Sequence, residues 1–374
     1  MMHFRNAAIV CGLLLLSGCA TQGYTARHAS TSQLAGIHEL HVVSVIEQND
    51  LEAQENVMLV NPALINAAAI EGGAVGGLVI GLQVQHQAHV FAEKHVAPLR
   101  TMLIGYDGRA TIRQTLEQGI ETMPVRMADW KAINADIAET DLLPANATTG
   151  SAWLILRTHY AMTPDFSGLQ VTTQASLYVV DSSPAWRSTP VYSNDFTYQS
   201  TLLQMPPKTG ADRKRMTDAE NARYAKLGID QQIAQTNAAD PYDPANAKLR
   251  EKIHDEQWQH ETNLKQAASV AWSIDERAEW FDKQWQADQA ASLKQAMSEG
   301  GQQTARMLAL DITQPQPLDA EGGKADWRTV YRDAQRSIQD APDGKVYSVA
   351  NGDVTHGAAF LGQTTNVYVA PPAH

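Results

Sequence analysis

Histidine pairs are the residues of this sequence whose types and spacing could bind a metal ion. His38 and His41 lie three residues apart, as do His86 and His89, and His95 follows them. On a helix that spacing places two imidazoles on one side, but a zinc site needs three or four such ligands. His38 and His41 fall in an expected strand, where they face opposite ways, and only His95 could join the other pair. We therefore expect neither a metal nor a cofactor.

The sequence also lacks the motifs of common catalytic chemistry. It contains no G-x-S-x-G nucleophile elbow, no G-x-x-x-x-G-K-[ST] phosphate loop and no H-E-x-x-H motif. His254 and His260 are six residues apart, which suits neither a helix nor a strand, and the adjacent Asp255 and Glu256 point in different directions on a helix. A solvated helix face explains these groups better than a paired acid and base. The pattern predicts no catalytic residue and no enzyme.

The two thiols of the chain, Cys11 and Cys19, both lie near the amino terminus. Arg5 is the one formal charge before an apolar run over 7–16, and this run of about 10 residues is too short to cross a ~30 Å hydrocarbon core as a helix. A basic start followed by a short apolar run is typical of a signal peptide. We expect one over residues 1–18.

The residues around the second cysteine, Leu16-Ser17-Gly18-Cys19, resemble the lipobox of bacterial lipoproteins. The resemblance implies that the chain is cut before Cys19, that the sulfur receives a diacylglycerol, and that the new amine is acylated. Such acyl chains hold a protein on a membrane, and a lipid-bound Cys19 leaves no thiol for a disulfide or for catalysis. Ala20 implies the outer membrane, since an aspartate there tends to retain members of the family in the inner one. The small polar residues that follow predict a tether over 19–35.

Acidic residues outnumber basic ones, and this excludes one class of partner. The formal net charge is −12, and it becomes −13 when Arg5 leaves with the signal peptide, because 28 basic residues then face 41 acidic ones. Nucleic-acid binding needs a basic patch, and the basic run 213–215 is flanked by Asp212 and Asp218. We expect no nucleic acid as a partner. The expected partners are the membrane, through the acyl chains on Cys19, and other envelope proteins or copies of this chain.

Hydrophobic patterns predict an α/β domain over residues 36–205. A period of two predicts a strand with one buried face over 169–180, and apolar residues three or four apart predict a helix over 109–122. The other expected elements are strands over 37–46, 124–129, 152–162 and 191–199 and a helix near 131–140.

The segment over 62–98 is apolar and rich in glycine. Gly73, Gly77 and Gly81 are four residues apart, so a helix that contains them would have one face almost without side chains. The five glycines here would cost such a helix about 4–5 kcal/mol, and close packing against another backbone is the usual compensation. A membrane-spanning helix is marginal because Glu71 lies near its centre. The alternatives are a buried helix, or a helix to Glu71 followed by a turn and a strand.

Residues 212–312 predict a helical region whose last helix packs on the α/β domain. Capping-box pairs mark the start of two helices, Thr217 with Glu220 and Ser273 with Glu276. The expected helices lie near 218–234, 246–271 and 274–299, with an interruption at Gly300-Gly301 and a further turn or two up to 312. Four tryptophans of this region are expected to pack between helices or in the core: Trp258, Trp272, Trp280 and Trp285.

The last part of the chain has two expected segments. Residues 313–326 have the composition of a linker. Over 327–374 we expect a short helix near 327–339 and a hairpin that turns at Asn351-Gly352, since Asn-Gly is a strong two-residue turn signal.

Together these elements predict an α+β fold. It is a mixed sheet with an antiparallel β-meander packed by helices, plus a long helical insertion and a C-terminal β-hairpin. The order of elements resembles the periplasmic α/β modules of curli secretion channels and of the TolB amino-terminal domain, and it is supplied by 37–46, 109–129, 152–199 and 292–312. The chain departs from that pattern by inserting residues 62–98 and about 80 helical residues before the last helix.

The expected function is that of a non-enzymatic lipoprotein on the periplasmic face of the outer membrane, which binds or scaffolds other envelope proteins. The first alternative is a subunit of an oligomeric secretion or pore assembly, formed through residues 62–98. The second alternative is an envelope hydrolase.

Overall fold

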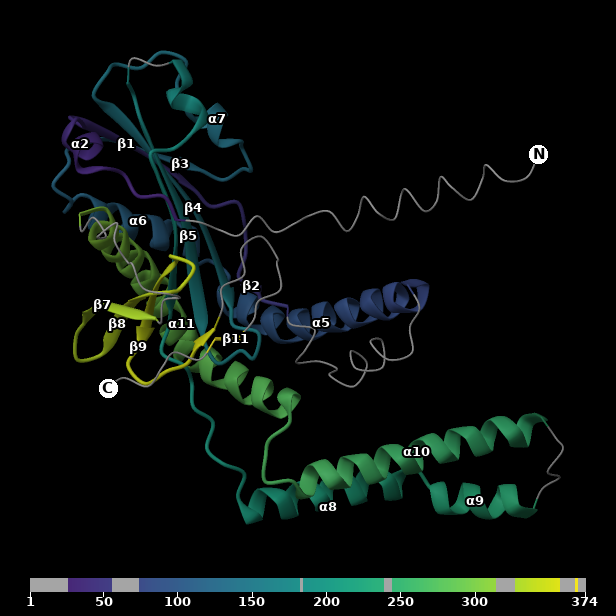
Figure 1. Ribbon diagram of the computed structural model, residues 1–374. Coiled ribbons are helices and arrows are strands. Elements are labelled where there is room, and N and C mark those ends of the chain that lie inside the picture. The colour runs from purple at the N-terminus through teal and green to yellow at the C-terminus, as the bar shows by residue number, and fades with distance from the viewer. Residues whose placement is uncertain are drawn as a thin grey trace, which may run out of the picture.

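The computed structural model describes residues 26–55, 74–181, 184–238, 244–313, 327–356 and 367–368. Figure 1 shows a body built around one sheet and an arm of helices that projects from the body. The α+β class and the mixed sheet expected from the sequence are confirmed.

The strand order in the sheet is β3-β1-β4-β5-β6-β9-β8-β7. Strand β1, Glu39–Val45, pairs in parallel with β3, Met127–Ile133, on one side and with β4, Ser151–Met162, on the other. The expected meander consists of β4 and two strands antiparallel to their neighbours, β5 (Leu169–Val179) and β6 (Tyr192–Gln199). The short strand β2, Glu52–Ala53, pairs with the end of β4.

The connection from β3 to β4 differs from the expected one. A helix was expected near 131–140, but β3 extends to Ile133, and helix α7 covers Glu139–Leu142 alone. Strand β3 pairs with β1 as far as Val45 opposite Ile133. Pairing with a neighbouring strand therefore overrides the local pattern at these residues.

Both faces of the central strands β4, β5 and β6 are buried, where one buried face was expected for 169–180. One face packs on α6, Gly108–Ile120, and α11, Ile274–Thr313, and the other on a smaller cluster beside α7 and η1, Pro184–Ser188. On the side of β5 that alternation predicts to be open, Gln170 is 1% exposed. Its side-chain oxygen accepts a hydrogen bond from Gln54 at 2.6 Å. Polar residues can be buried here because hydrogen bonds satisfy them.

Helices α6 and α11 approach each other so closely that glycine is required at their contact. A Cβ on Gly301 would lie 2.1 Å from Thr115 Oγ1 and 2.5 Å from the Ile112 carbonyl oxygen. A Cβ on Gly300 would lie 2.4 Å from Val171 Cγ2 of β5. The expected interruption at Gly300-Gly301 is therefore wrong, since α11 continues through both residues and uses them to pack.

The break in α11 lies earlier, at Ala287–Ala290. Asp288, Gln289 and Ala290 all have positive φ, between 50° and 59°, which is unusual for residues with a Cβ. Figure 1 shows that the first part of α11 lies towards the arm and that the second part crosses the sheet. The part of α11 before the break already packs in the body, where Phe281 and Trp285 are buried in the main core, so the break lies within the body.

The glycine-rich segment enters the described part of the chain as helix α5, Ala74–Met102. This helix is continuous, so the alternative of a turn and a strand after Glu71 is wrong for these residues. Gly77 and Gly81 lie in the first part of α5, and Gly73 lies outside the described residues. Within the ranges that the structure describes, no helix combines the length and the hydropathy needed to span a membrane.

The carboxyl end of the predicted tether is docked on the body. Arg27 exchanges two backbone hydrogen bonds with Ser193, at 2.8 and 2.9 Å. Helix α2, Thr31–Ala35, follows and begins with a capping box. A tether over the whole of 19–35 is therefore wrong, because the residues from Arg27 onward belong to the body.

Three helices form the arm: α8 (Gly210–Lys226), α9 (Ile229–Ala238) and α10 (Pro244–Ala268). Both α8 and α9 lie along α10 (Figure 1). The capping box of α8 is formed by Thr209 and Asp212, so the expected start at Thr217 with Glu220 is wrong. The expected box of Ser273 and Glu276 at the start of α11 is confirmed, because the backbone N–H of each residue donates to the side chain of the other.

The C-terminal region joins the main sheet as three strands: β7 (Arg328–Arg332), β8 (Arg336–Asp340) and β9 (Val346–Ala350). The helix expected near 327–339 is wrong, because β7 and β8 occupy that range and β9 pairs in parallel with β6. A C-terminal hairpin is present, but its turn lies between β8 and β9, where Gly344 has a φ of 87°. Asn351-Gly352 follows β9 instead. A separate two-stranded sheet is formed by β10 (Thr355–His356) and β11 (Val367–Tyr368).

Candidate interaction site on the helical arm

The residues predicted to anchor the protein and to pack its glycine-rich helix do not form a described site. Cys19 and Gly73 lie outside the described residues, so lipidation stays a prediction. The structure gives the backbone of α5 at Gly77 and Gly81 but not the side chains around them. Close packing of these glycines also stays a prediction.

The candidate metal-binding histidines do not form one cluster. Three of them contact carboxylates, and His95 Nε2 also lies 3.7 Å from Asp275 Oδ1. His38 precedes β1, and His86 lies exposed on α5. The pairs are His41 with Asp129 at 2.8 Å, His89 with Glu55 at 2.7 Å, and His95 with Asp282 at 2.6 Å. Within the described residues, no three His, Cys, Asp or Glu side chains form a group that could hold a metal ion.

The pair of His95 and Asp282 docks α5 on α11. The His95 ring is 1% exposed and lies against Phe91 and Phe166, with centroids 4.7 and 5.3 Å away. Burial raises the pKa of Asp282, and the hydrogen bond from His95 opposes that shift. A buried pair with these neighbours positions α5 against α11.

The four tryptophans have different surroundings. Trp285 is 2% exposed and donates to the Phe166 carbonyl, and Trp280 packs partly buried against the core, both as expected. Trp272 lies between α10 and α11 rather than in a helix, and its indole N–H donates to the Pro206 carbonyl at 2.8 Å. Trp258 is 66% exposed, so the expectation that it packs is wrong.

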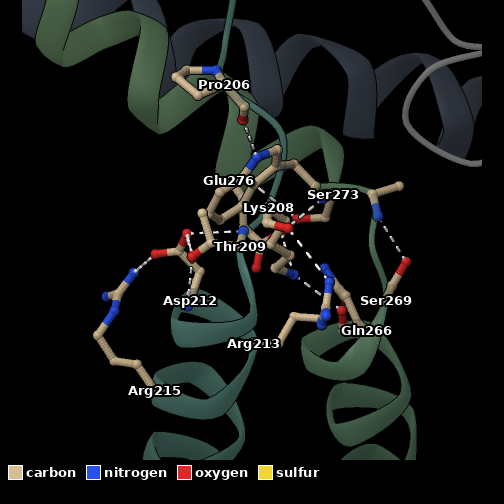
Figure 2. A network of polar contacts seen from close by, with 12 residues as sticks. Pro206, Lys208, Thr209, Asp212, Arg213, Arg215, Gln266, Ser269, Ser273 and Glu276 are labelled. Atoms are coloured by element: carbon tan, nitrogen blue, oxygen red, sulfur yellow. Dashed lines mark hydrogen bonds and ion pairs between the residues drawn. The ribbon is translucent and has the colours of Figure 1, made fainter.

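The base of the arm is built around a buried lysine. The Lys208 side chain has 0% exposure, and its Nζ donates to the Gln266 carbonyl oxygen at 3.1 Å and lies 3.5 Å from Glu276 Oε2. The Trp272 ring centroid lies 5.1 Å from the same Nζ. Figure 2 shows Lys208 among the ends of α8, α10 and α11, beside both capping boxes. These contacts join the two chain segments through which the arm meets the body.

Polar contacts also hold α8 against α10. Glu220 accepts two hydrogen bonds from Arg223, each at 2.9 Å, and a third from His260 Nδ1 of α10 at 2.8 Å. These bonds, that from Arg223 foremost, lower the pKa of Glu220 from 4.5 to about 2. The His260 ring stacks on Tyr224, with centroids 4.0 Å apart. Glu220 is therefore charged at neutral pH and links the two helices.

A cleft of about 380 Å³ lies along this seam, between α8 and α10. Its walls include Glu220, Arg223, Asn263 and Glu276. These groups already bond to one another or to Lys208 and His260. The cleft therefore shows a polar seam that stabilises the arm rather than a set of free catalytic groups.

The outer side of α10 carries the exposed tryptophan among acidic residues. Three exposed carboxylates share the side of Trp258: Glu251 and Asp255, seven and three residues before it, and Glu261, three residues after it. Helical spacing places them on the same side as Trp258. The exposed Lys265, seven residues after Trp258, lies at the edge of this mainly acidic side. We call Glu251, Asp255, Trp258 and Glu261 the arm face. Tryptophan is enriched at the centres of protein interfaces, which makes the arm face the candidate interaction site.

Comparisons with known proteins returned no match for this chain: no family model, no curated protein and no solved structure. The body has β1, α6, β3, the meander and α11 in the expected order. The elements β2 and α5 lie between β1 and α6, and the short α7 stands in place of the helix expected near 131–140. The resemblance to curli-channel and TolB modules stays a prediction.

Lys208 is the important residue that sequence reasoning missed. It follows two prolines in "PPKTG", a stretch that predicts a chain break, and a single lysine is normally solvated. The one local signal was the box of Thr209 and Asp212, three residues apart. Nothing in the sequence shows that Gln266 and Glu276 come back to the same point.

Proposed function

We propose that this protein is a lipoprotein on the periplasmic face of the outer membrane, anchored through Cys19, that binds another envelope protein through the arm face without catalysis. The projecting arm is the observation that carries the proposal. Helix α10 alone has 25 residues, which corresponds to a length of about 37 Å. The arm helices pack on one another and hardly on the body, so the arm presents a surface that the fold of the body does not use.

The chemistry of the arm face defines its partner. An exposed tryptophan surrounded by three carboxylates fits an apolar pocket rimmed by Lys or Arg side chains. The partner is therefore a protein with a basic surface. Because exposed charges are screened by salt, this association weakens as ionic strength rises.

The docked tether supports the anchoring part of the proposal. Arg27 is fixed to the body, so eight residue steps separate the fixed chain from Cys19 and reach at most about 26–29 Å. A body held this close to the membrane leaves a long arm as the element that can extend to a partner.

A photo-crosslinking aromatic residue in place of Trp258 tests the arm face in living cells. We expect a defined crosslinked species from position 258 and none from Gln257, which is exposed on another side of α10. Reversal of the three carboxylates (Glu251→Lys, Asp255→Lys, Glu261→Lys) should abolish that species. Equal crosslinking from 257 and 258, or a species that the reversal does not affect, would contradict binding through the arm face.

Cys19→Ser tests the anchor separately. We expect an uncleaved chain without lipid, because only a thiol receives the diacylglycerol. Cys11→Ser, within the predicted signal peptide, is the matched control and should be processed normally. Normal cleavage and membrane retention of the Cys19→Ser chain would refute the lipoprotein part of the proposal and leave the arm face untouched.

A further inference from the structure

A second pocket, of about 420 Å³, lies on the body, away from the arm. Its walls come from residues 49–51, which follow β1, from the end of β4 at Tyr160, and from the turn between α5 and α6. We call it the β1–β4 pocket. Pockets of this size hold small molecules, and the proposed function makes no use of this one.

Tyr160 supplies a polar group that has no partner among the described residues. The residue is 3% exposed, and its backbone is fixed by Gln48, whose side chain bonds both the N–H and the carbonyl. Its hydroxyl makes no hydrogen bond to any described residue, although it lines the pocket. It lies 3.5 Å from the point where a Cβ on Gly108 would stand. The hydroxyl opens on the pocket, so a ligand there can accept its hydrogen bond.

Burial keeps the hydroxyl of Tyr160 a donor. It raises the pKa of Tyr160 well above its usual range, and the nearby Asp50, Glu52 and Asp107 raise it further, against the effect of Arg109. The phenol is therefore protonated under physiological conditions and can donate one hydrogen bond to an acceptor in the pocket.

The remaining polar groups of the pocket balance in charge. Arg100 is bound to Glu93 and to the Leu51 carbonyl, while Arg109 donates to Asn49 and lies 3.8 Å from Asp107. The Asp50 side chain is exposed and carries no ion pair to a described residue. Two arginines and two aspartates leave no net charge, so the pocket favours neither an anion nor a cation. It offers both donors and acceptors, which suits hydroxyl groups, since each hydroxyl donates one hydrogen bond and accepts others.

The position in the fold supports a ligand independently. Strand β1 lies between β3 and β4, and the chain goes from β1 to β3 on one side of it and then returns to β4 on the other. Ligands of α/β sheets bind beyond the carboxyl ends of parallel strands where the strand order reverses in this way. The β1–β4 pocket lies at that point.

We propose that the β1–β4 pocket binds a neutral saccharide of one or two rings, with Tyr160 donating to a hydroxyl of the sugar. The opposed charges of Asp50 and Arg109 bind neighbouring hydroxyls, one as an acceptor and the other as a donor. This binding is separate from the arm face, so either can be true without the other.

Titration of the purified full-length protein with glucose, N-acetylglucosamine and maltose, followed by saturation-transfer NMR and calorimetry, tests the proposal. At least one sugar should bind saturably, and Tyr160→Phe should weaken it about tenfold, as expected for the loss of one hydrogen bond. The melting temperature of Tyr160→Phe should equal or exceed that of the parent, because the lost hydroxyl had no described partner. Tyr224→Phe, on the arm, is the matched control and should bind normally.

Gly108→Ala keeps the phenol and places a methyl group beside it, so this variant should also weaken binding if the sugar reaches Tyr160. The proposal is overturned if none of the three sugars binds. It is also overturned if both variants bind with unchanged affinity, which places the site elsewhere. Saturable binding of acetate or phosphate in place of the sugars would show an anion site and would overturn the assignment of ligand class.

Discussion

The body and the arm of this protein are stabilised by different kinds of contact. In the body, both faces of the central strands are covered, and large side chains such as Leu154, Phe196 and Tyr198 are fully buried. In the arm, the buried apolar side chains among the described residues are Ile229, Ile253 and Ala267. Hydrogen bonds and ion pairs at Lys208 and Glu220 supply much of the remaining stabilisation of the arm.

This difference indicates how the molecule divides its tasks. A closely packed body tolerates few changes, because its helices touch through glycines and leave no room for added atoms. A thinly packed arm with polar contacts can change single residues without disturbing the body. The surface that evolves with a partner is therefore expected on the arm, and the fixed framework in the body.

The largest expected effect comes from filling the contact between α6 and α11. Gly301→Leu should lower the free energy of unfolding by about 3 kcal/mol or more, because the new side chain meets Thr115 and the backbone of Ile112. Gly210→Leu is the matched change in the arm, where the nearest atom to an added Cβ is 3.9 Å away, and it should leave stability unchanged or slightly higher. Chemical denaturation measures both, and equal effects would erase the contrast between the two regions.

The next effect concerns the base of the arm. Glu276→Gln keeps a capping side chain but leaves the buried Lys208 ammonium without its carboxylate, and we expect a loss of about 1–3 kcal/mol. Hydrogen exchange should quicken in α8 and α10 and stay unchanged in the sheet. Lys214→Met, which removes the exposed pair with Asp218, should change stability by less than about 0.5 kcal/mol. Loss of protection in the sheet as well would show that arm and body do not unfold separately.

A gain in stability is expected at the break inside α11. Gln289 is exposed and has a φ of 59°, so Gln289→Gly should relieve strain and raise the free energy of unfolding by about 1 kcal/mol. Gln284→Gly, in the regular part of the same helix, should lower it by about 1 kcal/mol instead. Melting temperatures show whether each variant is more or less stable than the parent. A lower melting temperature for both variants would mean that α11 is not broken at Gln289.

The smallest expected effect is a change of stability with pH, and it comes from Glu220. Its pKa is lowered from 4.5 to about 2 in the folded arm, so its contribution is complete above pH 4.5 and is lost as pH falls towards 2. Circular dichroism should therefore show part of the helix signal weakening between pH 4.5 and 2. In Glu220→Gln that part of the pH dependence should disappear, and an unchanged pH profile would exclude Glu220 as its cause.

Strands were predictable where local patterns and burial agree. Residues 152–199 alternate or run apolar, and β4, β5 and β6 lie where expected. The helix expected near 327–339 failed because β8 is fixed by pairing with β9, a contact that the local pattern does not contain. Gly300-Gly301 was interpreted as an interruption for the same reason, since its use as a contact depends on Thr115 and Val171, far away in the sequence.

The candidate sites were less predictable than the fold. From the sequence, Trp258 is expected to pack and Lys208 to be solvated, but the structure has Trp258 exposed and Lys208 buried. Burial depends on which helices meet, and the local sequence does not contain that information. Tyr160 lies in an apolar strand that predicts core, and only the turn between α5 and α6 leaves open space beside its hydroxyl. Cys19 is the exception, because the residues directly before it in the sequence are enough to predict its lipidation.

Removal of the arm tests the central claim most directly. The Lys208 Nζ contact with the Gln266 carbonyl shows that the two ends of the arm lie close together, so a short Gly-Ser linker can replace residues 210–268. We predict that this protein remains folded, with the sheet as protected from hydrogen exchange as before, and that it reaches the membrane but gives none of the crosslinked species that the full chain forms in cells with a general amine-reactive crosslinker. If the armless protein still forms the same crosslinked species, the arm is not the binding element and the account is wrong.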